Sequence, residues 1–253
     1  MSAMAALSFA AHLSAYPVLL LPPIILLAFD RRPTAAASPA PKAISFAAKH
    51  LAAFVLSSGA LLAMAYLVAG EASSTAVLWH TYGAHLSLQD LSPNIGLWWY
   101  FFVQMFDPFR AFFLAVFWLH LGSYVGGLSI RIRTQPLAVI AILLGLFSVF
   151  KPYPSVSDAS LFLAVLSLYR HLFPLMRYSF VAIATILYAS CLGPAFYHLW
   201  LYAGSGNANF FYAITLVWSL GQGLLVSDLA FAVLRAEWEV ERPEMVGKEI
   251  RQI

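Results

Sequence analysis

The sequence predicts an all-α fold, a polytopic transmembrane helical protein with about seven spans. Three observations predict it. Hydrophobic residues make up 62% of the 253 and charged residues 10%, against roughly 45–50% and about 25% in soluble proteins. The apolar residues gather in long runs, and a helix needs about 20 mostly apolar residues to cross a bilayer. The basic residues lie between these runs, almost all of them on one side.

The apolar segments follow one another along the whole chain, at about 4–29, 44–69, 95–128, 136–150, 159–173, 178–203 and 209–234. The fourth and fifth are short for a full span, which allows a tilted or re-entrant helix. The third is expected to break at Asp107-Pro108, because proline lacks an N–H and restrains the residue before it. Ser92 and Pro93 predict its start, as an N-cap and a first-turn proline.

We expect a single transmembrane helical domain over residues 1–234. A Pro/Ala/Ser-rich stretch at about 33–43 has no periodicity and is predicted to be a cytoplasmic linker. Residues 235–253 are polar and rich in glutamate, so a solvated cytoplasmic tail is predicted there.

Orientation follows from the positive-inside rule. Of the 14 lysine and arginine residues, only Lys151 falls in the loops opposite to the linker, and Arg110 lies within the third segment. The rule therefore places the C-terminus in the cytoplasm. It places the loops at 70–94, 151–158 and 204–208 on the other side of the membrane.

Several functions are excluded by residue usage. The net charge of +3 comes from scattered residues, without the basic stripe and interleaved aromatics of nucleic-acid binding. Cys191 is the single cysteine, so no internal disulfide forms, and its apolar surroundings predict a buried thiol. The seven histidines match no metal-ligand spacing, and no nucleophile has an attendant base. We therefore predict no catalytic residue, no metal and no cofactor.

The loop Gly-Ser-Gly-Asn-Ala-Asn at 204–209 carries the best candidate site. Its glycines allow a tight turn, and Asn209 is predicted to cap a helix that begins at Phe210. A helix N-terminus suits a phosphate, and the amide of Asn207 suits a sugar hydroxyl. An ordinary turn with a helix cap is the structural alternative.

Three further features have both a functional and a structural interpretation. Asp107 and Arg110 share a helix face and are expected to pair, either as an internal structural pair or at a ligand. The aromatic run at 98–102, which includes Trp98, Trp99 and Phe102, indicates an interfacial belt or a wall for acyl chains. The spacing of Ser155 and Asp158 predicts a capping box with no chemistry.

From about Ser92 onward the chain resembles the PIG-U family, the U subunit of the GPI transamidase. The resemblance rests on SPNIGLWWYFFVQMFDPFRAFF at 92–113, FKPYPSVSD at 150–158 and FYHLWLYAGSGNANFFYAITLVWSLGQ at 196–222. The first 91 residues fit more loosely. Family members are longer, so the resemblance implies the C-terminal portion of a family chain, with several upstream spans missing.

The resemblance implies a non-catalytic subunit of the endoplasmic reticulum membrane, with a fold related to membrane mannosyltransferases. It implies a catalytic cysteine on another chain, and as partners the other transamidase subunits, the GPI lipid and the precursor's C-terminal signal peptide. Asn207 and Asn209, in a loop then luminal, become the leading lipid-binding candidates, with Asp107, Trp98, Trp99 and Phe102 second. Arg131 and Arg133 are expected to meet anionic phospholipid among the membrane lipids, at about 1 kcal/mol each.

Two other classes of function remain. A membrane mannosyltransferase-like enzyme of GPI biosynthesis needs an acidic motif, whereas Glu71, Asp90 and Asp158 are isolated. A transporter is favoured by paired helix breaks in repeated halves, and only the break at Asp107-Pro108 is predicted.

Overall fold

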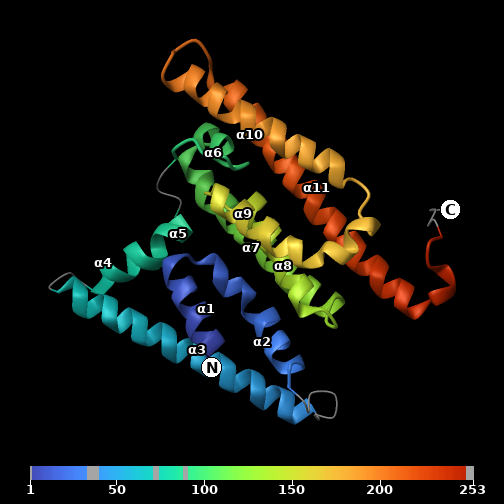
Figure 1. The fold of residues 1–253 in the computed structure, drawn as a ribbon. Coiled ribbons are helices and arrows are strands. Elements are labelled where there is room, and N and C mark those ends of the chain that lie inside the picture. The colour runs from blue at the N-terminus through green and yellow to red at the C-terminus, as the bar shows by residue number, and fades with distance from the viewer. Residues whose placement is uncertain (1, 33–39, 71–73, 88–90, 249–253) are drawn as a thin grey trace. The chain divides into compact units, whose positions relative to one another are not determined.

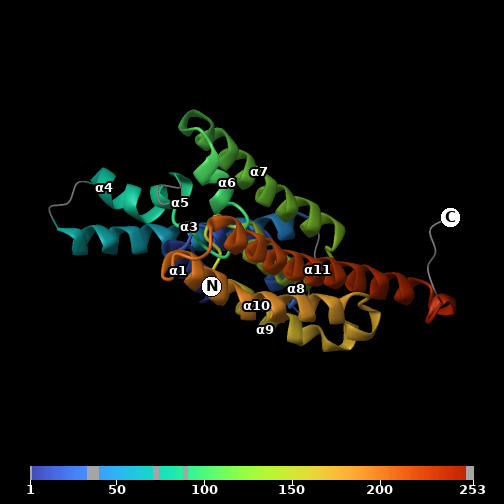
Figure 2. The same cartoon turned by 90° about the horizontal axis from the view of Figure 1, so that it is seen from above.

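The computed structural model describes residues 2–32, 40–70, 74–87 and 91–248. Within these ranges the regular structure is entirely helical, which confirms the all-α class (Figures 1 and 2). The chain divides into two compact units. The first unit comprises residues 1–92 and 102–143, and the second unit comprises residues 93–101 and 144–253. A single transmembrane domain over 1–234 stays a prediction.

Five helices of the described residues are long and apolar enough to span a membrane. They cover Lys42–Ala69, Asp107–Arg131, Val156–Leu175, Ser179–Leu201 and Ala208–Glu241. Three shorter apolar helices within the described residues cover Ser2–Leu13, Tyr16–Asp30 and Pro136–Phe150. These eight stretches correspond to the seven predicted segments, because the first segment is divided in two and the third is helical as a candidate span only from Asp107 onward.

The first segment breaks at Tyr16-Pro17 in the first unit. It forms α1 (Ser2–Leu13), a 3₁₀ turn η1 (Tyr16–Leu20) and α2 (Leu21–Asp30). Helices of 12 and 10 residues are about 18 and 15 Å long, short of the roughly 30 Å hydrocarbon core. Both pack on α3 (Ala40–Ala69), as shown in Figure 1. The hydroxyls of Ser8 and Ser58 lie 2.7 Å apart across the α1 contact.

The helix start predicted at Ser92 is wrong. Residues 91–98 are not helical, and α6 runs only from Trp99 to Gln104. The side chain of Asn94 instead accepts a hydrogen bond from the N–H of Gly96 at 2.7 Å, a local bond that competes with helix formation. Gly96 also packs so closely on Pro154 that a Cβ would lie 2.5 Å from its ring. The break at Asp107-Pro108 is confirmed, because α7 (Asp107–Arg131) begins there.

Short helices α4 (Ser74–Leu78) and α5 (Ala84–Ser87) complete the first unit, joined by a π-helical turn η2 (Trp79–Gly83). The fourth segment is α8 (Pro136–Phe150), which passes from the first unit into the second. At 15 residues it is about 22 Å long, short as predicted. Its side chains are largely buried, as expected for a helix that is apolar on all sides.

The fifth segment begins with the predicted capping box. Ser155 and Asp158 each bond the other's backbone N–H at the start of α9 (Val156–Leu166). The 3₁₀ helix η3 (Ser167–Leu175) continues it. Together they make a candidate span of 20 residues, longer than the sequence predicted.

The last two segments form an antiparallel hairpin in the second unit, with α10 (Ser179–Leu201) and α11 (Ala208–Glu241) side by side in both views (Figures 1 and 2). Gly221 permits the close approach, since a Cβ there would lie 3.1 Å from the carbonyl oxygen of Ala182. The carboxylate of Asp228, 3% exposed, accepts a hydrogen bond from the N–H of Tyr178 at 2.6 Å. Cys191 is exposed on α10, so the predicted burial of its thiol is wrong.

Two predicted boundaries change. Residues 40–43 of the expected linker belong to the first turn of α3, and residues 33–39 lie outside the described residues. The expected solvated tail begins as helix, since α11 continues to Glu241 before the turn η4 (Pro243–Met245). An ion pair between Arg235 and Glu239, four residues apart at 2.6 Å, supports this extension.

Candidate functional site

A tight polar turn joins α10 to α11 at residues 202–207. Gly204 has a φ of +63°, a conformation that favours glycine. The N–H groups of Ser205 and Gly206 both donate to the carbonyl oxygen of Leu199 at 3.0 Å. These bonds satisfy the end of α10 and bring the chain directly back to α11.

Asn207, and not Asn209, caps α11. Its side-chain oxygen accepts hydrogen bonds from the N–H groups of Asn209 at 3.0 Å and Phe210 at 3.3 Å. The helix therefore begins at Ala208, two residues earlier than predicted. The reason is that Asn207 has extended backbone angles, which place its side chain under the first turn.

Asn209 lies in the first turn of α11 and is exposed, as Asn207 is. Its side-chain oxygen accepts a hydrogen bond from the hydroxyl of Tyr100. The Tyr100 ring stacks on Tyr212, with ring centroids 4.6 Å apart. The predicted aromatic run and the predicted polar loop are therefore parts of one site. Tyr100 was missed because its partner lies 109 residues away in the sequence.

Trp99 is buried beneath this turn rather than exposed as a belt or an acyl wall. It is 4% exposed and packs against Trp200 and Phe211, with centroid distances of 6.0 and 5.8 Å. Trp98 donates its indole N–H to the carbonyl oxygen of Phe150 at 3.2 Å. Both side chains therefore support the segment that carries Tyr100.

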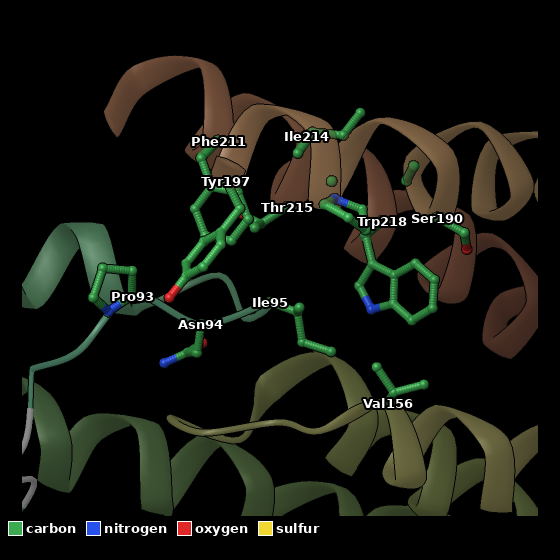
Figure 3. A pocket seen from close by; sticks show the side chains of 13 residues that line it. Pro93, Asn94, Ile95, Val156, Ser190, Tyr197, Phe211, Ile214, Thr215 and Trp218 are labelled. Atoms are coloured by element: carbon green, nitrogen blue, oxygen red, sulfur yellow. The ribbon is translucent and has the colours of Figure 1, made fainter. Parts of the chain in front are cut away.

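An apolar pocket of ≈ 540 Å³ opens along the α10–α11 hairpin (Figure 3). The loop at 93–95, the start of α9, residues 189–197 of α10 and residues 211–218 of α11 line it. Tyr197 and Phe211 lie about one helical turn from the polar turn. From Tyr197 to Ala189 the pocket extends about 12 Å further along α10.

The pocket has few polar groups. Figure 3 shows the Tyr197 hydroxyl directed toward Pro93 and Asn94 at one end, while the Trp218 indole lies toward the other end, near Val156. The Trp218 N–H is buried and has no hydrogen-bond partner among the residues that the structure describes. An apolar channel with a polar opening fits a chain-like hydrophobic ligand that has a polar end.

The remaining second-tier candidates belong to the first unit. Phe102 is fully buried and packs edge-on against Phe117 at 5.4 Å. Asp107 and Arg110 form the predicted pair, with 2.5 Å between Oδ1 and Nη2. They line a separate pocket of ≈ 650 Å³. Because the chain breaks before α7, the Asp107 side chain is 84% exposed at a helix start rather than inside a continuous span.

Arg131 and Arg133 lie at the end of α7. Both Nη atoms of Arg133 contact the carboxylate of Asp30, at 2.9 and 3.1 Å. Arg131 is exposed in the last turn of the helix, where a cation interacts favourably with the helix dipole. No group of three or more potential metal ligands is found among the described residues.

Comparison with known proteins gives consistent matches. A family model described as GPI transamidase subunit PIG-U matches residues 1–218. The chain is 45% identical over 157 residues to GPI-anchor transamidase component PIGU of Mus musculus, a match that covers 62% of this chain and 36% of that protein. It is 37% identical over 235 residues to GPI transamidase component GAB1 of Saccharomyces cerevisiae, which covers 92% and 56%. For the GAB1 homolog of Schizosaccharomyces pombe the identity is 39% over 204 residues, which covers 81% and 48%. The aligned part is about half or less of each relative's length.

Proposed function

Because the chain belongs to the family of the GPI transamidase subunit PIG-U, we propose that it is a non-catalytic membrane subunit of that complex and helps to bind the GPI lipid. The polar turn contacts the head group and the adjacent pocket holds a hydrocarbon chain. The observation that carries this proposal is their proximity, since the apolar pocket begins about one helical turn from Asn207 and Asn209.

The polar turn and the first turn of α11 offer groups suited to a phosphoglycan. Asn207 and Asn209 are exposed, and an amide supplies donors and acceptors for hydroxyl groups. The N-terminus of α11 adds the positive end of a helix dipole, which favours a phosphate. The bond from Tyr100 holds Asn209 in place, so little side-chain entropy is lost on binding.

The hydrophobic C-terminal signal of a precursor protein is the alternative ligand of the pocket. Its apolar side chains fit the same lining, but it has no phosphoglycan to bind at the turn. Loss of lipid contact on substitution of Asn207 and Asn209, with signal contact retained, favours the lipid.

We assign the chemical step to another subunit. Transamidation at a peptide bond needs a nucleophile with an attendant base, whereas Cys191 lies in the candidate span Ser179–Leu201. We also propose that the protein resides in the endoplasmic reticulum membrane with its C-terminus in the cytoplasm. This orientation follows from the distribution of lysine and arginine and places the polar turn in the lumen.

The test is surface staining for GPI-anchored proteins in cells that lack their own U subunit, after expression of this chain. We expect staining with the wild type and little with Asn207→Ala/Asn209→Ala, while co-purification of the other subunits is unchanged. Ser205→Ala is the matched control, because the structure uses the backbone of this residue in the turn. Normal staining with the double variant refutes the lipid site. A wild type that neither assembles nor restores staining refutes the proposed function for this chain.

A further inference from the structure

A second polar site lies at the opposite end of the α10–α11 hairpin, in a pocket of ≈ 430 Å³. The end of η3, the connection to α10, one face of α11 and the turn at 246–248 form its walls. The candidate spans 156–175 and 179–201 are joined here, and the span 208–241 leads into the charged tail. When these helices cross a bilayer, this pocket lies at the level of the lipid head groups.

Arg235 builds the pocket. Its side chain is 7% exposed, and its Nε donates to the carboxylate of Glu239 at 2.6 Å. Its Nη2 donates to the carbonyl oxygens of Met245 at 3.3 Å and Lys248 at 2.8 Å. Glu239 neutralises the guanidinium, and the two carbonyl bonds tie the turn to α11. The hydrogen bonds of Arg235 therefore stabilise the wall of the pocket.

Two other cations of the pocket, Arg177 and Lys248, have no such partner among the residues that the structure describes. The Arg177 guanidinium lies 4.1 Å from the centroid of the Phe231 ring, which orients its plane while its edge can still donate hydrogen bonds. The Lys248 ammonium lies 3.9 Å from the Met245 sulfur. Neither forms an ion pair with a carboxylate within residues 91–248 or the other described ranges.

Within the described residues, the pocket therefore combines two positive charges that have no carboxylate partner with an apolar wall that includes Pro174, Leu175 and Val246. The sequence favoured Arg131 and Arg133 for contact with an anionic phospholipid. Arg133, however, is already paired with Asp30. Basic pockets between transmembrane helices are suited to anionic lipid head groups. A phosphate between Arg177 and Lys248 would supply the missing negative charge.

We propose that this pocket binds the head group of an anionic phospholipid, with its phosphate held by Arg177 and Lys248. The proposal is independent of the GPI site, which lies at the other end of the hairpin. The apolar wall distinguishes this pocket from a site for free phosphate, because the wall contacts the glycerol and upper acyl region of a bound lipid.

The test is native mass spectrometry of the full chain in detergent, titrated with phosphatidylinositol and, separately, with phosphatidylcholine. We expect preferential binding of phosphatidylinositol, weakened about fivefold by Arg177→Gln or Lys248→Gln and about 25-fold by the double variant. Arg170→Gln is the matched control, because Arg170 is an exposed cation of η3 that does not line the pocket. Thermal unfolding confirms that each variant remains folded.

Four results overturn the proposal. They are an affinity unchanged in the double variant, an equal loss in the control, equal binding of phosphatidylcholine, and displacement of phosphatidylinositol by excess inorganic phosphate. The last result identifies a site for a free anion instead. None of these results depends on transamidase activity, so this proposal and the GPI site are tested separately.

Discussion

Filling the apolar pocket at Gly193 tests the lipid site directly. Gly193 lines the pocket on α10, and a Cβ built there meets nothing within 4 Å. Gly193→Leu therefore places a four-carbon side chain in the pocket space without a clash at its first atom. Leucine also favours the helix over glycine by roughly 0.8 kcal/mol, so we expect the variant to fold.

The magnitude follows from the volume displaced. An acyl chain that is kept out of the pocket stays in the bilayer and is not moved into water, so no hydrophobic transfer energy is lost. The expected loss is instead the cost of overpacking, about 1–3 kcal/mol for Gly193→Leu, or roughly 5- to 150-fold in affinity. Gly193→Ala adds one carbon and should weaken binding less.

The assay is photocrosslinking in microsomes with a GPI precursor that carries a photoreactive acyl chain. Gly223→Leu is the matched control, since a Cβ at Gly223 of α11 also meets nothing within 4 Å and the residue does not line the pocket. We expect crosslinking to fall in the order wild type, Gly193→Ala, Gly193→Leu. Full crosslinking to a folded Gly193→Leu protein would show that the lipid chain lies elsewhere.

Three further changes test individual contacts in the second unit. Tyr100→Phe removes the hydroxyl that bonds Asn209 and keeps the stacked ring. Lipid binding should weaken by about 1 kcal/mol, or about fivefold, and lipid crosslinking should fall accordingly. Unchanged crosslinking means that Asn209 needs no support from Tyr100. Asp228→Ala leaves the N–H of Tyr178 without its acceptor, and thermal unfolding in detergent should show a loss of about 1–3 kcal/mol, whereas an unchanged midpoint would argue that water replaces the carboxylate. Ser155→Ala removes one half of the capping box at α9 and should cost about 1 kcal/mol in the same assay, with Ser160→Ala on the exposed face of α9 as the control.

Features that depend on neighbouring residues could be read from the sequence. Three such features depend only on residues three or four positions apart or closer. They are the break before Asp107, the pairing of Asp107 with Arg110, and the capping box of Ser155. The N-cap of α11 was placed two residues late, at Asn209 instead of Asn207. Both residues follow a glycine-rich turn and both are good caps, so the choice depends on backbone angles set by the hairpin.

Burial could not be read from the sequence in the same way. Cys191 lies in an apolar run and is nevertheless exposed on α10, while Asp228 in the next helix is almost fully buried. In a membrane helix, apolar residues face lipid as readily as protein, so hydrophobicity predicts a span but not its inner face. The packing of the α10–α11 hairpin decides which residues face lipid and which are buried in the protein.

The sequence by itself determined that this is a helical membrane protein and where most of its long helices lie, but it did not predict the short helices at 74–87, inside the expected loop at 70–94. The reason is that a membrane span is one continuous stretch of chain, so its length and hydrophobicity are set by consecutive residues. Only the tertiary structure decided that Tyr100 meets Asn209 and that the apolar pocket opens beside the polar turn. It also decided that Arg177 and Lys248 share a pocket in which Glu239, the carboxylate among the described lining residues, is paired with Arg235. These contacts join residues far apart in the chain, and they depend on how helices of similar hydrophobicity pack against one another.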